Sequence, residues 1–221
     1  MVKMKRLVNP DKRKYLEGVG PFLAEHGKKI RTHSIVIYKP FNETGENLIF
    51  GGQNFTHKPH WGTARLFAST RSFTLESPSL PIHVRTGVIH TFSEQLVVSA
   101  NSVVIEVDFP NPYADGINTV LFNGRRGRTT SLDVIKHESH GIPLDILIHD
   151  LKLKRSPWRF TIDRNHPTII YGDGPMLLEV SAPSGKRKLD AVNGCYVMIS
   201  SHEEVFVKAT GTGTLFEVVF Y

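Results

Sequence analysis

Two pairs of histidines have the spacing that comes nearest to a chemical motif. His57 and His60 are three residues apart, as are His137 and His140, and two imidazoles at this spacing can chelate one metal ion where the backbone is helical or tightly turned. Neither pair extends to His-Glu-x-x-His, and Pro59 disfavours a helix at the first pair. We therefore expect surface or loop histidines and no metal site, and leave open whether the four histidines converge in space.

No other pattern in the sequence indicates catalysis or a bound cofactor. Gly-x-Ser-x-Gly, the P-loop pattern and Gly-x-Gly-x-x-Gly are absent, so the nucleophile elbow and the usual phosphate cradles have no representative. The single cysteine, Cys195, lies in an apolar segment, which is typical of a buried thiol rather than a nucleophile. We expect no disulfide, no catalytic residue, no cofactor and no enzyme activity.

Basic residues form two groups that could contact acidic partners or phosphates. The formal net charge is +6, and the first 14 residues carry +5 of it, so the rest of the chain is nearly neutral. The second group is a short arginine and glycine segment. The candidate residues for protein or nucleic-acid contact are Lys3, Lys5, Arg6, Lys12, Arg13, Lys14, Arg125, Arg126 and Arg128. Lysine and arginine also protect sheet edges without any ligand, so both interpretations stay open.

The elements that must position these residues are mainly strands. From Ser34 onward, β-branched runs alternate with turns rich in Gly, Pro and Asn, which is typical of short strands. In Ile146–Leu153, polar residues interleave with apolar ones as on a half-solvated sheet, whereas Glu217–Phe220 is almost continuously apolar, as in a strand covered on both faces. We predict an all-β protein, a β-sandwich or barrel of many short, mainly antiparallel strands.

Residues 1–31 differ from the rest of the chain in charge and in local pattern. They contain the helical segments Pro10–Glu17 and Pro21–His26. We predict a basic N-terminal arm, residues 1–31, with one or two short helices, and a β-rich body, residues 32–221. The body is either one domain or two packed β modules divided near the 123–143 loop.

The sequence has no stretch near the roughly 20 apolar residues that a membrane-spanning helix needs, and no secretory signal. We therefore expect no membrane span and a soluble protein that is intracellular or incorporated into a virion. No acidic residue precedes Asp11, which is the charge pattern of a mitochondrial targeting segment, so a mitochondrial location stays open.

Three segments resemble the family named for altered inheritance of mitochondria. Ser79–Ile89 contains a proline, an apolar strand and an Arg-x-Gly turn, and Thr168–Gly172 and Gly172–Val180, which follow Trp158, are similar to later repeats of that family. The resemblance implies a barrel-like β fold of the TRAP type and a non-catalytic assembly role, with no catalytic residues to carry over.

These observations favour a non-enzymatic structural or assembly protein, a subunit of a large complex such as a virion or phage tail. The N-terminal arm and the 123–143 loop would contact copies of the same chain or other subunits, and would become ordered only on assembly. The alternative is a nucleic-acid-associated β-barrel that binds phosphates through the arm and the arginine-rich loop.

Overall fold

The computed structural model of the chain describes residues 3–6, 13–28, 35–38, 63–76, 81–85, 87–90, 97–100, 102–110, 119–122, 132–135, 142–151, 157–163, 165–192, 194–200 and 204–221. These residues form one helix and nineteen strands. The elements are β1 (Lys3–Arg6), β2 (Arg13–Tyr15), α1 (Val19–Glu25), β3 (Ile35–Tyr38), β4 (Thr63–Ser69), β5 (Phe73–Glu76), β6 (Pro81–Val84), β7 (Gly87–His90), β8 (Val97–Ala100), β9 (Val104–Pro110), β10 (Thr119–Phe122), β11 (Leu132–Ile135), β12 (Leu144–Asp150), β13 (Trp158–Asp163), β14 (Thr168–Asp173), β15 (Met176–Ala182), β16 (Gly185–Asp190), β17 (Cys195–Ile199), β18 (Glu204–Gly211) and β19 (Thr214–Phe220).

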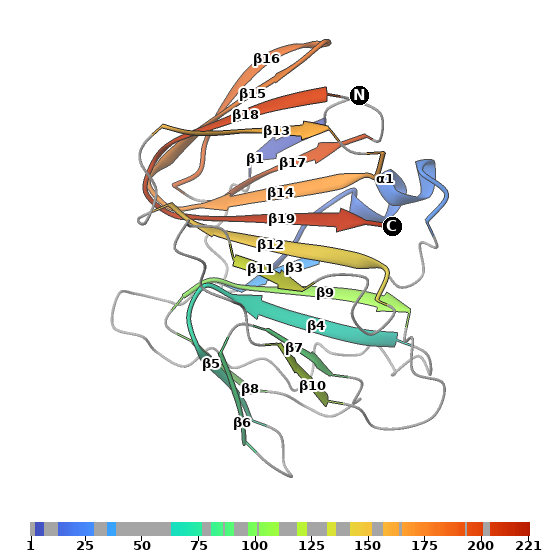
Figure 1. Cartoon of the computed structure of the whole chain (residues 1–221), viewed down its shortest axis with the longest axis vertical. Coiled ribbons are helices and arrows are strands. Elements are labelled where there is room, and N and C mark those ends of the chain that lie inside the picture. Colours follow the sequence, from blue (N-terminus) through green and yellow to red (C-terminus); the bar gives the residue numbers. More distant parts are fainter. Residues whose placement is uncertain are drawn as a thin grey trace.

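The strands form four sheets that lie in four layers (Figure 1). Sheet C has the order β6-β5-β8 and sheet B the order β10-β7-β4-β9-β3-β2. Sheet A has the order β1-β17-β14-β19-β12-β11 and sheet D the order β13-β18-β15-β16. We call sheets B and C the N-terminal sandwich, and sheets A and D the C-terminal sandwich. The predicted all-β, antiparallel architecture is confirmed.

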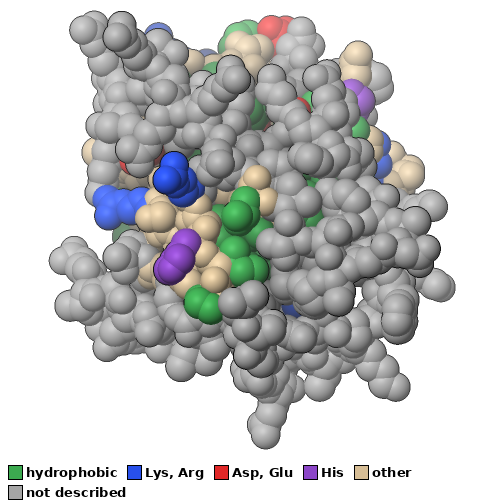
Figure 2. Space-filling model, turned by 60° about the horizontal axis from the view of Figure 1, so that its bottom comes forward, with side chains coloured by type: hydrophobic (Ala, Val, Ile, Leu, Met, Phe, Trp, Pro, Cys, Tyr) green, Lys and Arg blue, Asp and Glu red, His purple; other side chains and the backbone are tan. Residues whose placement is uncertain are grey.

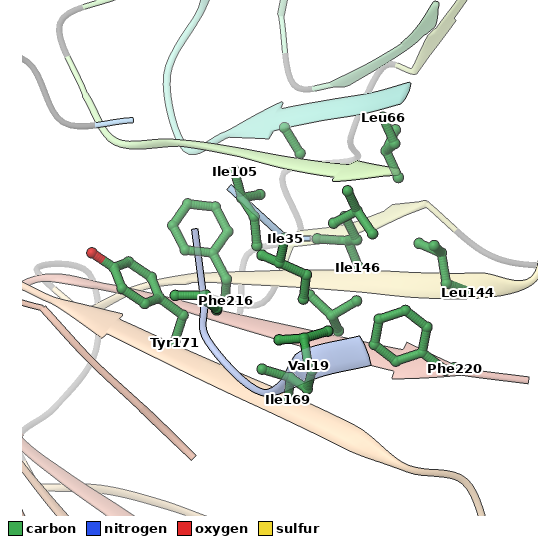
Figure 3. Close-up of a cluster of buried hydrophobic side chains, with 14 of the residues drawn as sticks. Val19, Ile35, Leu66, Ile105, Leu144, Ile146, Ile169, Tyr171, Phe216 and Phe220 are labelled. Atoms are coloured by element: carbon green, nitrogen blue, oxygen red, sulfur yellow. The ribbon is translucent and has the colours of Figure 1, made fainter. Parts of the chain in front are cut away.

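The largest hydrophobic core lies between sheets A and B (Figure 3). Leu66 and Ile105 of sheet B meet Ile146 and Phe216 of sheet A, and Val19 of α1 packs into the same cluster. Each of these side chains is at most 2% exposed. Full burial of an aliphatic side chain contributes about 1.5–3 kcal/mol, so this contact holds the two sandwiches together.

Each sandwich also has a core of its own, which covers the other face of sheet A or B. In the N-terminal sandwich, Phe67 of sheet B packs with Leu75 of sheet C, and in the C-terminal sandwich Val197 of sheet A packs with Leu178 of sheet D. Cys195 is fully buried in this second core, as predicted. Both faces of sheets A and B are therefore largely covered, and Glu106 and Glu217 on their central strands are buried.

Two sequence-based interpretations of local structure are wrong. Ile146–Leu153 was expected to be half-solvated, but β12 lies inside sheet A and its polar residue His149 is 5% exposed. The predicted helix Pro10–Glu17 includes β2, which pairs with β3; pairing at the edge of sheet B gives this backbone hydrogen bonds that a short isolated helix would not sustain. The second predicted helix, Pro21–His26, is confirmed by α1.

The N-terminal strand β1 is built into sheet A. It pairs antiparallel with β17, from Lys3 opposite Met198 to Arg6 opposite Cys195. The division of the chain into residues 1–31 and 32–221 stays a prediction, but β1 and β2 both belong to the sheets of the body. Among the described residues, no helix is long and apolar enough to span a membrane.

Sheets A and B have equivalent strand orders. Aligning β10-β7-β4-β9-β3-β2 with β1-β17-β14-β19-β12-β11 makes β4 equivalent to β14, β9 to β19, β3 to β12 and β7 to β17. The first strand of the chain, β1, takes in sheet A the place that β10 takes in sheet B. Sheets A and B are thus two versions of one topology, whereas the outer sheets C and D differ, with three and four strands.

Candidate functional site

Each sandwich holds one buried glutamate at the same point of its central sheet. Glu106 on β9 is the register partner of Phe67 on β4, and Glu217 on β19 is the partner of Ile170 on β14. Both face the interior of their own sandwich, because the residues alternating with them fill the core between sheets A and B. The side chains of Glu106 and Glu217 are 1% and 3% exposed.

In the N-terminal sandwich, Glu106 belongs to a cluster of ionisable groups. The Tyr38 hydroxyl donates a hydrogen bond to the Glu106 carboxylate. Arg65 Nε lies 3.9 Å from Glu106 Oε1 and 3.9 Å from Asp108 Oδ1. Burying charges is costly unless they are paired. Here the Arg65 guanidinium lies beside two carboxylates, and its positive charge partly offsets theirs.

The strand register aligns three residues across sheet B. Arg65 has Asp108 as its Cα partner on β9 and His90 as its Cα partner on β7. His90, Arg65 and Asp108 therefore form one row across three neighbouring strands of sheet B. Partner Cα atoms in antiparallel sheets are about 4.5–5.5 Å apart, so the Cα atoms of His90 and Asp108 are separated by about two strand spacings.

In the C-terminal sandwich, Glu217 has an aromatic environment. His149 Nε2 lies 3.5 Å from Glu217 Oε2, and the exposed fractions of the two side chains are 6% and 3%. The imidazole packs against Trp158 and Phe160, with ring centroids 4.4 and 6.0 Å away, and these two rings stack at 4.2 Å. The pair is thus enclosed by apolar groups.

The strand registers show where the two sandwiches differ. Tyr38 and His149 take equivalent positions, and each contacts the glutamate of its sandwich. The positions in sheet A that correspond to His90, Arg65 and Asp108 are, in the same order, Ile199, Thr168 and Val219. In the described part of sheet A, the counterparts of Arg65 and Asp108 are uncharged, so we take the cluster of Tyr38, Arg65, Glu106 and Asp108 in sheet B as the candidate site.

The basic residues predicted to contact partners are not part of this site. Lys3, Lys5 and Arg6 belong to β1, and Arg13 and Lys14 belong to β2. Lys12, Arg125, Arg126 and Arg128 lie outside the described residues. Nothing in the structure brings the two groups together or tests them, and their contact with a partner stays a prediction.

The four histidines of the two predicted pairs, His57, His60, His137 and His140, also lie outside the described residues. Within the described ranges, no three side chains of His, Cys, Asp or Glu are grouped so that they could hold a metal ion. Histidine and basic side chains gather on the face of the molecule seen from the sheet C end (Figure 2). His83 on β6 is exposed, with its Nδ1 3.1 Å from Thr74 Oγ1.

Comparison with solved structures identifies the architecture. The structure of YhhW from Escherichia coli matches with a TM-score of 0.55 and 9% identity over 100% of this chain and 98% of that one. YlbA from Escherichia coli, assigned to DUF861, matches with a TM-score of 0.55 and 10% identity over 98% and 86%. The fold is a cupin-like double β-sandwich. No family model and no curated protein matches the sequence.

A third cupin-like neighbour, YhaK from Escherichia coli, has a TM-score of 0.51 and 9% identity over 86% of this chain and 85% of that one. A further structure of YhhW, named there as a bacterial pirin, is a complex with nickel(II), with a TM-score of 0.55 and 9% identity over 100% of this chain and 99% of that one. At these identities the neighbours establish the fold of this chain and nothing about its ligands.

The cupin-like fold corrects two predictions. The resemblance to the family named for altered inheritance of mitochondria is wrong, because the whole chain matches pirin and DUF861 structures instead. The prediction of a virion or phage-tail subunit, with a nucleic-acid-binding barrel as its alternative, is wrong for the same reason. Short strand and turn motifs recur in unrelated β folds, so they carried no specific evidence of family.

Sequence reasoning missed the charged row, although a signal was present. Val104–Phe109 reads Val-Ile-Glu-Val-Asp-Phe and Leu215–Phe220 reads Leu-Phe-Glu-Val-Val-Phe. A carboxylate within an apolar run that is covered on both faces must be buried, and it then requires a partner. Glutamate is the third residue of both segments, and this shared residue reflects the equivalence of β9 and β19.

Proposed function

We propose that the N-terminal sandwich of this cupin-like protein binds one divalent metal ion at Glu106 and Asp108. The observation that carries this proposal is the pair of carboxylates two residues apart on β9, each with an oxygen 3.9 Å from Arg65 Nε. Carboxylate oxygens are ligands for divalent cations, and two of them on one face of a strand can bind the same ion.

The described side chains supply only some of the ligands that such an ion needs. They supply two carboxylates, and divalent first-row metals are held by carboxylate oxygens together with imidazole nitrogens. The nickel(II) in the structure of the bacterial pirin YhhW supports the proposal only in that a protein of this fold holds a divalent ion.

The residues around the proposed site have separate tasks. The Tyr38 hydroxyl holds the Glu106 carboxylate in place, and Arg65 places its positive charge near both carboxylates, with Nε 3.9 Å from an oxygen of each. A bound divalent ion would supply Lewis-acid polarisation of an oxygen ligand.

The absence of enzyme activity stays a prediction, and so does the association of this chain with copies of itself. We propose an intracellular location for the protein.

Metal binding should be tested on the full chain by equilibrium dialysis with nickel(II) and with manganese(II), followed by elemental analysis. We expect about one ion per chain, and at least a tenfold weaker binding of the same ion by the Glu106→Gln and Asp108→Asn variants. His83→Ala is the matched control, because His83 is an exposed histidine on sheet C of the same sandwich. A wild-type chain without saturable binding would refute the proposal.

The two histidine pairs of the sequence provide a second arm of this test. If His57→Ala and His60→Ala weaken binding while His137→Ala and His140→Ala do not, the first pair belongs to the site. Equal binding by wild type and the Asp108→Asn variant would contradict the proposed site.

A further inference from the structure

The outer face of sheet D carries a depression of about 290 Å³ that the proposed metal site does not use. Sheet D is the outermost layer of the C-terminal sandwich, so this face points away from the rest of the molecule (Figure 1). Side chains of three strands line the depression: Arg159 and Thr161 of β13, Phe206 and Lys208 of β18, and Glu179 and Ser181 of β15. The volume lies near the lower end of the range for small-molecule sites.

An aromatic ring stands at the centre of one row of the depression. Phe206 has Thr161 and Ser181 as its register partners on the two neighbouring strands. Both partners have short hydroxyl side chains, and Phe206 remains 54% exposed. Few large apolar side chains are this exposed among the described residues, the others being Leu121 and Val192. A planar apolar group can therefore reach the ring, with hydroxyl groups on either side.

The adjacent row of the same face is charged. Arg159, Lys208, Glu179 and Lys188 are successive register partners across β13, β18, β15 and β16. Lys208 Nζ donates a hydrogen bond of 2.8 Å to Glu179 Oε1, which lowers the pKa of Glu179, with further contributions from Lys188 and Arg159. Three cations surround one carboxylate, so the row has a net positive charge and favours an anion.

We propose that this depression binds a small aromatic carboxylate. The ring of the ligand would pack on Phe206, since offset aromatic pairs add about 0.5–1.5 kcal/mol to simple burial. Its carboxylate would lie at Arg159 and Lys208, because a guanidinium and a carboxylate form charge-assisted hydrogen bonds. The alternation of side chains along β18 places the ring and the cation two residues apart on one face, which matches the length of such a ligand.

Benzoate is the probe, and its binding to the full chain should be followed by chemical-shift changes or calorimetry. We expect saturable binding with a dissociation constant on the order of 1 mM, in the range for a ligand of this size. Benzamide, the neutral analogue, and acetate, which lacks the ring, should each bind at least tenfold more weakly. Equal binding of benzoate and benzamide would overturn the proposal.

Two variants locate the site, and both positions are on the surface, where substitution leaves the fold intact. Phe206→Ala and Arg159→Gln should each weaken benzoate binding at least fivefold. Val192→Ala removes an exposed apolar side chain elsewhere, and Arg85→Gln an exposed cation of the N-terminal sandwich; both should bind like wild type. If Arg85→Gln weakens binding as much as Arg159→Gln, the attraction is due to the charge of the whole protein and the proposed site is wrong.

Discussion

Sheets A and B share a strand order, but the two sandwiches differ in what they bury. In the N-terminal sandwich, Arg65 and Asp108 accompany the central glutamate, whereas the equivalent positions of the C-terminal sandwich are Thr168 and Val219. The C-terminal sandwich keeps a His149 and Glu217 pair inside an aromatic enclosure. One topology therefore supports both an ionisable cluster and a nearly apolar core.

This difference directs the search for a functional site to the N-terminal sandwich. Each buried charge lowers stability unless partners compensate for it, and the C-terminal sandwich shows that the fold tolerates apolar residues at these positions. The row of the N-terminal sandwich is thus not required by the topology. A ligand is the explanation that we propose for it, and the comparison can be tested position by position.

The largest effect is expected at Arg65. Arg65→Met leaves Glu106 and Asp108 without this guanidinium, and removing one partner from a buried ionic cluster costs about 3–5 kcal/mol. Thr168→Val, at the equivalent position, loses one hydrogen bond to the His166 carbonyl and should cost about 1 kcal/mol or less. Urea unfolding in the presence of a chelator measures both. Equal costs would show that the two sandwiches use these positions alike.

A smaller effect is expected in the C-terminal sandwich. His149→Phe keeps the packing against Trp158 but removes the contact with Glu217, which should cost about 1–3 kcal/mol. The double variant with Glu217→Met should regain most of this, because replacing both partners leaves no uncompensated charge. The corresponding double variant Tyr38→Phe and Glu106→Met should not recover, because Arg65 loses a carboxylate. Recovery in both would indicate two purely structural pairs.

The smallest effect concerns the contact of sheet A with the N-terminal segment. The Tyr196 hydroxyl donates a 2.9 Å hydrogen bond to the Glu17 carbonyl, and burial, with the Glu17 charge, raises the pKa of Tyr196 to about 12. Because the unfolded chain releases this proton near pH 10, the stability of wild type falls as the pH rises from about 10 to about 12.

Tyr196→Phe should cost about 1 kcal/mol at neutral pH, where the hydrogen bond is intact. The stability difference between the variant and wild type should shrink between about pH 10 and pH 12, since only wild type carries this titrating group. Thermal unfolding across this range measures the difference. A difference that stays constant with pH would show that Tyr196 ionises equally in the folded and unfolded chain.

Some features of the molecule were predictable from local sequence. The β-branched runs and the turns between them predicted the all-β architecture, Pro21–His26 indicated the helix α1, and the apolar neighbours of Cys195 indicated a buried thiol. These predictions succeeded because side-chain shape and turn chemistry act within a few residues of the chain.

Other features depended on which strands pair. The sequence showed polar residues alternating in β12 and interpreted them as solvated, because a period of two does not reveal what covers each face of a sheet. The four-layer stacking buries His149 on one side and Ile146 on the other. The local sequence pattern also could not predict that β1 is equivalent to β10, because β1, the first strand of the chain, pairs into a sheet of the C-terminal sandwich.

The sequence by itself determined the strand content of this protein, its single buried thiol and the presence of Glu106 within an apolar run. Only the tertiary structure decided that His90, Arg65 and Asp108 share a row. These residues are separated by 25 and 18 positions in the chain, and cross-strand register over such distances is set by the packing of whole sheets rather than by neighbouring residues.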